Sequence, residues 1–154
     1  ASRKKKISWL LLSHDYRSNE GDNNCLKPIA EQLEKSGLTN FKYVTTELSA
    51  AVLKAITGQV DGVVAGRMHL AIASLGMGVP VLALTYQDKF QGLFARFKLP
   101  EWLLLSPKVF LDAQHFIASI ERFVDELDVL REQVNLRLND VQELSQANFD
   151  FIDR

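Results

Sequence analysis

Short apolar runs alternate with amphipathic segments along most of this chain, and no other feature restricts its fold as strongly. Residues 7–12 form an almost continuously apolar run, the pattern of a strand buried on both faces of a parallel sheet. Helix-like apolar spacing follows, and Gly37 and Gly58 stand where two helices should stop. Short connections between alternating strands and helices favour βαβ units. We therefore expect a Rossmann-like α/β fold, with helices on both faces of a parallel sheet.

The expected elements follow one another in regular order. Strands are expected at residues 7–12, 41–44, 60–65, 79–84 and 102–105, and helices at 26–35, 47–57, 69–77 and 91–97. Asn23 or Asn24 is the expected cap of the first helix. From Asp112 onward the chain lacks Gly and Pro, and its apolar spacing predicts one long helix, or two in sequence, within 111–154. Because roughly 40 helical residues would span about 60 Å, we expect the far end to contact a second chain or another domain.

Composition narrows the class of protein. The 154 residues suit a single domain, and 47% hydrophobic with 24% charged residues is typical of a soluble globular protein. A net charge of -1 gives no bulk attraction to nucleic acid, so any anion site must be local. Cys25 is the only cysteine, which excludes an intrachain disulfide and a thiolate metal cluster. No apolar run approaches the roughly 20 residues of a transmembrane helix, and we expect a cytoplasmic protein.

The segment Gly66-Arg67-Met68-His69 lies between the third expected strand and the third expected helix. In open parallel sheets, ligands bind beyond the carboxyl ends of the strands. Gly66 can adopt backbone angles that other residues avoid, and it lets a ligand approach the chain. Arg67 would oppose the helix dipole unless an anion binds between its guanidinium and the helix N–H groups. We predict an anion site here, with Met68 inside it and His69 as a further donor or a proton carrier.

Further polar residues follow the first and fourth expected strands. Lys89 would add positive charge after the fourth strand, although a lysine there is more often simply solvated. His14 and Asp22 lie in a polar loop after the first strand, where Asp22 has the simpler alternative of a turn or capping residue. The glycines form neither a dinucleotide fingerprint nor a phosphate-binding loop, so we predict no NAD, ATP or other cofactor, and no metal site.

The stretch from Val60 to Lys89 is similar to the C-terminal signature of the polysaccharide pyruvyl transferase family. The parts of that signature occur in the family's order: Arg67-Met68-His69 as an Arg-x-His step, a helix of small residues, Gly78-Val79-Pro80 leading into a strand, and Tyr86 with Lys89 three residues later. The likeness extends more weakly to His14 at the end of the first strand, to Asp22, and to the long C-terminal helix.

The resemblance implies one Rossmann-like half of a B-type glycosyltransferase fold, with a further domain ahead of this chain. It implies transfer of a pyruvyl group from phosphoenolpyruvate to a pair of sugar hydroxyls of a polysaccharide or its precursor. The positions implicated in substrate binding are Gly66, Arg67, Met68, His69, Lys89, Tyr86, His14 and Asp22. His69 is in addition a candidate for the catalytic acid. Without the further domain we expect this chain to bind the donor weakly and not to turn over. We expect the protein in the cytoplasm, or at the inner face of a membrane.

Two other functions remain open at this point. A nucleotide-sugar-binding domain of a B-type glycosyltransferase or sugar epimerase would use the same cleft, but residues 66–75 lack the carboxylate that such domains use for a ribose. A non-catalytic oligomerising module would pair with a second copy through the C-terminal helix. A receiver-like module should have an acidic cluster after its first strand, where this chain has Ser13-His14-Asp15.

Overall fold

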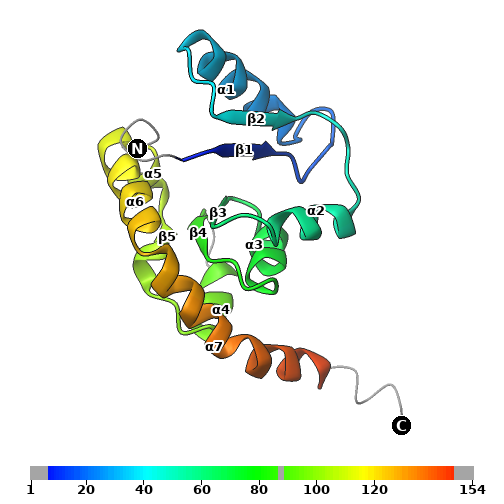
Figure 1. Ribbon diagram of the computed structural model, residues 1–154, viewed down its shortest axis with the longest axis vertical. Helices are drawn as coiled ribbons and strands as arrows, with labels where there is room; N and C mark the ends of the chain where they lie inside the picture. The colour runs from blue at the N-terminus through cyan, green and yellow to red at the C-terminus, as the bar shows by residue number, and fades with distance from the viewer. Residues whose placement is uncertain (1–6, 87–88, 148–154) are drawn as a thin grey trace. The chain divides into compact units, whose positions relative to one another are not determined.

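The computed structural model describes residues 7–86 and 89–147, and these form two compact units (Figure 1). The first unit covers Ala1–Leu53 and the second Lys54–Arg154, so the boundary falls within helix α2, Ala50–Thr57. Each unit has its own parallel strands and helices. The expectation that residues 1–154 make a single domain stays a prediction.

The first unit is a pair of parallel strands with one helix. Strand β1, Trp9–Leu12, pairs in parallel with β2, Phe41–Val44, and helix α1, Asn23–Lys35, contacts both strands (Figure 1). The expected cap of α1 was wrong, because Asp22 occupies the N-cap. Gly37 follows the end of α1 at a φ of +73°, a conformation that favours glycine, so it ends the helix as predicted.

The second unit contains a three-stranded parallel sheet. Its order is β3-β4-β5, formed by Val63–Ala65, Val81–Leu84 and Leu104–Leu105. The first three residues of the central strand β4 are fully buried, and helix α3, Met68–Leu75, packs on both β3 and β4. Ala71 and Leu75 of α3 are completely buried. The small residues of α3 therefore allow the helix to approach the sheet closely.

The remaining helices complete the second unit. Helix α4 covers Lys89–Arg96, and the 3-10 helix η1 covers Glu101–Leu103. The first half of the strand expected at residues 102–105 was therefore wrong. A short helix α5, Pro107–Phe110, was not predicted. The long C-terminal helical segment forms two helices in sequence, which was one of the two expected arrangements. These are α6, Ala113–Asp125, and α7, Leu127–Gln146.

Helix α7 is anchored at the edge of the sheet where β3 and β4 begin. Arg131 donates hydrogen bonds to the carbonyl oxygens of Val60, at 3.1 Å, and Asp61, at 3.0 Å. Gly78, just before β4, has a φ of +77°, and a Cβ there would lie 2.5 Å from Oδ1 of Asn135. These contacts bind α7 to the two segments that enter the sheet. The candidate anion segment lies at the opposite ends of the same strands.

The fold class is α/β with parallel strands and a long C-terminal helix, which confirms the Rossmann-like expectation at that level. The strands of the described residues form a two-stranded and a three-stranded sheet, whereas we had expected one sheet. Across residues 7–86 and 89–147, no helix combines the length and apolar character needed to cross a membrane.

Gly62 offers a test of how tightly α6 and α7 pack on the sheet. A Cβ at Gly62 would lie 2.6 Å from Cδ2 of Leu127 and 2.9 Å from the buried ring of Phe123. We expect Gly62→Ala to lower the free energy of unfolding by about 1–3 kcal/mol, the usual cost of overpacking. Gly92 is the control, because it lies inside α4 and an added Cβ would have no described residue outside the neighbouring helix backbone within 4 Å. Gly92→Ala should be neutral or stabilising by up to about 1 kcal/mol in urea denaturation. Equal effects of the two changes would contradict this packing.

The start of α6 should make stability depend on acid pH. Oδ1 of Asp112 accepts the backbone N–H of His115 at 3.0 Å, and the imidazole of His115 lies beside it. These contacts, the backbone one first, hold the pKa of the Asp112 carboxyl below its ordinary value of 3.8. The cap is therefore stabilising above about pH 4, and this contribution is lost as the pH falls through the lowered pKa. We expect Asp112→Ala to destabilise the chain at neutral pH, with parent and variant converging in strong acid. A difference in unfolding free energy that does not change with pH would contradict this.

Candidate functional site

The segment predicted to bind an anion connects β3 to α3 in two residues. Gly66 follows the strand directly, and Arg67 is the N-cap of α3 with extended backbone angles, φ -103° and ψ 123°. The Arg67 side chain makes no capping hydrogen bond, and the first turn of α3 contains no acidic residue. The first helical hydrogen bond runs from Ala71 N–H to the Arg67 carbonyl at 3.2 Å. The N–H groups of residues 68–70 precede that bond, and they lie with the positive end of the helix dipole beside the half-buried Arg67.

Gly66 serves the site in a different way from the one expected. Positive φ angles among the glycines occur at Gly37 and Gly78, so Gly66 does not use a conformation reserved for glycine. That part of the expectation was wrong. Among the residues that the structure describes, and leaving aside the two chain neighbours of Gly66, nothing lies within 4 Å of the position that a Cβ would take at Gly66. The absent side chain therefore leaves open space at the start of α3, which is what close approach of a ligand requires.

Parallel pairing brings a second helix start to the same edge of the sheet. Ala65, the last residue of β3, pairs with Ala83 of β4, so the two strands end within one residue of each other at the same edge. Lys89 is the first residue of α4, the helix that follows β4, and its side chain is exposed. It therefore lies at a helix start instead of in the expected loop. Helices α3 and α4 contact each other. The carboxyl edge of the three-stranded sheet thus collects two basic residues, each at the start of a helix.

His69 and Tyr86 lie at this edge as well. His69 is the second residue of α3 and is exposed, so its imidazole is accessible to a ligand. Met68 is half-buried beside it. Tyr86 follows β4 by two residues and is 65% exposed, which leaves its ring without a packing role. Residues 87 and 88, between Tyr86 and Lys89, lie outside the described residues.

His14 and Asp22 come together in the first unit, in the loop that follows β1. Oδ2 of Asp22 accepts the backbone N–H of His14 at 2.9 Å and that of Asp15 at 3.0 Å. Asp22 therefore shapes this loop, which matches the simpler alternative of a turn residue. The contact of Asp15 with Asp22 was not predicted from the sequence. It is made by the backbone N–H of Asp15, so it leaves no pattern of side-chain types along the chain. The predicted contact of His14 and Asp22 with a ligand stays a prediction.

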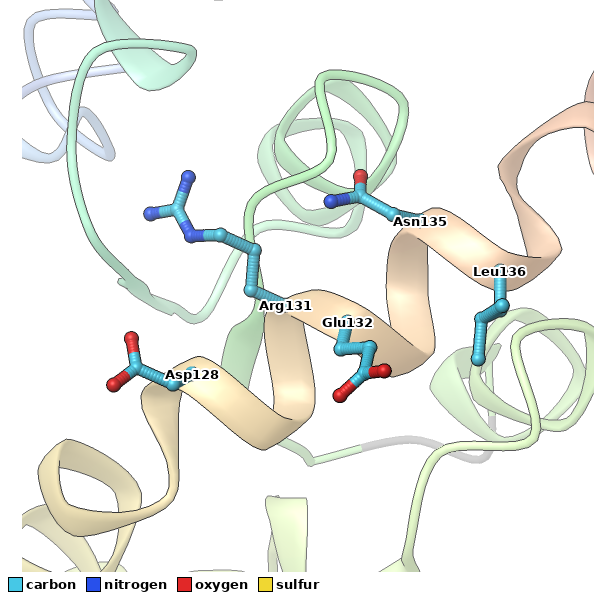
Figure 2. Close-up of a pocket in the computed structure, with 5 residues that line it drawn as sticks. All are labelled: Asp128, Arg131, Glu132, Asn135 and Leu136. Carbon is cyan, nitrogen blue, oxygen red and sulfur yellow. The ribbon is translucent and has the colours of Figure 1, made fainter.

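A surface depression of about 480 Å³ lies on α7, away from the predicted residues (Figure 2). Its lining residues are Asp128, Arg131, Glu132, Asn135 and Leu136. Figure 2 shows Arg131 and Asn135 projecting from one side of α7 and Glu132 from another. Arg131 is held by the carbonyl groups before β3, and the carboxylates of Asp128 and Glu132 would repel an anion. The depression is at the edge where the strands begin, so it is not the predicted anion site.

A protein-family model matches more than half of this chain. The model for "Polysaccharide pyruvyl transferase" matches residues 2–88, which are 87 of the 154 residues. The chain belongs to the polysaccharide pyruvyl transferase family. Neither the curated proteins nor the solved structures provide a match.

The family match includes most of the predicted site and leaves out one member. The Arg67-Met68-His69 step, Tyr86, His14 and Asp22 all lie within residues 2–88. Lys89 lies one residue beyond the matched segment, so its role rests on its position at the start of α4. Among residues 7–86 and 89–147, no three His, Cys, Asp or Glu side chains are placed to hold a metal ion.

Gly66 provides a probe that should change the family's Arg-x-His segment without disturbing the fold. Because an added Cβ meets no described residue beyond its chain neighbours within 4 Å, we expect Gly66→Ala to leave the free energy of unfolding unchanged or to raise it by up to about 1 kcal/mol. Urea denaturation followed by far-UV circular dichroism measures this. A loss of stability as large as that predicted for Gly62→Ala would show that Gly66 is required for folding.

Proposed function

We propose that this chain binds phosphoenolpyruvate at the carboxyl edge of its three-stranded sheet, as the donor half of a pyruvyl transferase. The start of α3 carries the proposal, because N–H groups of its first turn, the helix dipole and Arg67 all favour an anion at one place. Lys89 at the start of α4 adds a second cation at the same edge. Phosphoenolpyruvate carries a phosphate and a carboxylate, so two cationic groups suit it better than one.

Each site residue has a chemical task in this proposal. The guanidinium of Arg67 can hold an oxyanion through two parallel hydrogen bonds, and the ammonium group of Lys89 balances further negative charge. His69, one residue into α3, is the candidate for the proton donor or for a phosphate contact. Gly66 keeps the approach to the helix start open. Tyr86 presents an exposed ring at the same edge, where a sugar could stack.

The transfer balances with phosphoenolpyruvate and a sugar diol as the only reactants. The methylene carbon of the enolpyruvyl group gains a proton, and the adjacent carbon becomes oxocarbenium-like. Two sugar hydroxyl oxygens bond to that carbon, the bond to the phosphate oxygen breaks, and inorganic phosphate leaves. The two sugar hydroxyl groups lose one proton each. One of these protons balances the proton gained by the methylene carbon, and the other leaves with the phosphate. Positive groups around the phosphate stabilise the charge that develops as it leaves.

The sugar acceptor and the remaining parts of the enzyme belong to the proposal too. The family description supplies a polysaccharide as the type of acceptor. A further domain ahead of this chain, the B-type glycosyltransferase architecture, a cytoplasmic location and pairing of copies through the C-terminal helix stay predictions. If the further domain contributes the acceptor site, this chain alone should bind the donor without transferring the pyruvyl group.

Calorimetric titration with phosphoenolpyruvate tests the proposal. We expect the parent chain to bind, and Arg67→Ala to weaken binding by roughly tenfold to a hundredfold, the effect of losing charge-assisted hydrogen bonds. Gly66→Ala should weaken binding as well, because its methyl group enters the open space at the helix start. Inorganic phosphate and pyruvate, titrated separately, should each bind more weakly than phosphoenolpyruvate.

Arg96→Ala is the matched control for charge. Arg96 is an exposed cation in the last turn of α4, at the opposite end of the helix from Lys89. Its removal should leave the affinity for phosphoenolpyruvate unchanged. Equal heats from the parent and Arg67→Ala would reject the assignment of the site. An equal loss with Arg96→Ala would show that only the overall charge of the chain matters.

A further inference from the structure

We infer that Asp22 is a positioning residue, which fixes the loop that presents His14 instead of contacting the substrate itself. The inference rests on the proposed function and on the separate prediction, made from the family resemblance, that His14 contacts the ligand. One oxygen of the Asp22 carboxylate accepts two consecutive backbone N–H groups, those of His14 and Asp15, at 2.9 and 3.0 Å. That oxygen is therefore directed into the loop.

The two amides resemble a small anion site that the chain fills with its own carboxylate. Consecutive N–H groups in a turn form a concave site for anions, and hydrogen bonds to a charged acceptor are stronger than neutral ones. Asp22 also donates its own N–H to the carbonyl of Asp15 at 2.8 Å. Because Asp22 is the N-cap of α1 and His14 lies two residues after β1, these bonds tie the start of the helix to the end of the strand.

Packing beside Asp22 leaves the loop little freedom. A Cβ on Gly21 would lie 2.3 Å from the carbonyl oxygen of Arg17 and 2.7 Å from that of Asp15. Ser13 is completely buried, and its hydroxyl donates to the same Asp15 carbonyl at 3.1 Å. Four hydrogen bonds thus hold the backbone at His14 and Asp15: two to the Asp22 carboxylate, and two to the Asp15 carbonyl from the Asp22 amide and the Ser13 hydroxyl. Such convergence is what a side chain held for function requires.

The charge of Asp15 is balanced separately. Its carboxylate contacts Arg17, with Nη2 2.7 Å and Nε 3.1 Å from Oδ2, and this hydrogen bond raises the pKa of the Arg17 guanidinium. Glu20 also accepts from Arg17, at 2.7 Å. The ion pairs of Arg17 lie at the exposed tip of the loop, whereas the Asp22 carboxylate acts on the backbone next to His14. The two carboxylates therefore have different tasks.

Amide hydrogen exchange tests the inference without any ligand. We expect Asp22→Ala to speed exchange at the His14 and Asp15 amides by roughly tenfold or more, because both lose a charged acceptor. Asp22→Asn should have a smaller effect, since its amide oxygen can still accept. Asn24→Ala is the control, because Asn24 donates to the carbonyl of Ser18 in the same loop and does not bond to either amide. Unchanged exchange in Asp22→Ala would overturn the inference.

Phosphoenolpyruvate titration then separates positioning from direct contact. We expect Asp22→Ala to lose affinity about as strongly as His14→Ala, the double variant to lose no more than either, and Asp22→Asn to recover most of the loss. Additive losses, or a loss in Asp22→Asn as large as in Asp22→Ala, would show that the Asp22 carboxylate contacts the ligand and would overturn the inference. Undiminished affinity in Asp22→Ala would make the loop purely structural. If the parent chain shows no heat of binding, the proposed function fails, while the exchange rates still decide whether Asp22 positions His14.

Discussion

The parallel pairing of β3 with the buried strand β4 is the constraint on which the candidate site depends. Because Ala65 and Ala83 are register partners, the two strands end at the same edge, and the chain must begin α3 and α4 from neighbouring positions. Two helix starts at one edge add their dipoles to the charges of Arg67 and Lys89. The first three residues of β4, up to and including Ala83, have no exposed surface, so the register is fixed by burial on both faces.

Local pattern predicted the elements and their order, but it could not predict where each begins. Residues 60–65 were expected to form a strand of six residues, and the structure forms β3 from Val63. The carbonyl groups of Val60 and Asp61 instead accept hydrogen bonds from Arg131, about seventy positions later in the chain. Apolar spacing contains no information about such partners. A second boundary was also missed. Pro100 precedes a 3-10 turn, and this turn takes the place of the first half of the expected last strand.

The site was predicted best where its chemistry is local. Arg67 was expected at a helix start because a short strand, a glycine and a helical pattern are adjacent in the sequence, and the structure has it at the N-cap. For Gly66, the open approach to the chain was predicted correctly, whereas the glycine-specific backbone angles were not, because residue type alone does not determine backbone angles. A turn or capping role for Asp22 was among the alternatives, but its backbone partners were not predictable, since these bonds form only once the loop after β1 has closed. The family match agrees with the local motif and ends just before Lys89.

Closure of that loop through Asp22 divides it into a fixed base and an interchangeable tip. Gly21 binds the Arg17 carbonyl through its backbone, so the bond does not depend on the side chains between them. Residues 18–20 are exposed, and their replacement by others of equal number would leave the start of α1 in place. A shorter tip would instead remove the residues that let Gly21 and Asp22 reach the carbonyl groups of Arg17 and Asp15. The side chains of this tip are therefore open to exchange, whereas its length is constrained by the backbone bonds on either side of it.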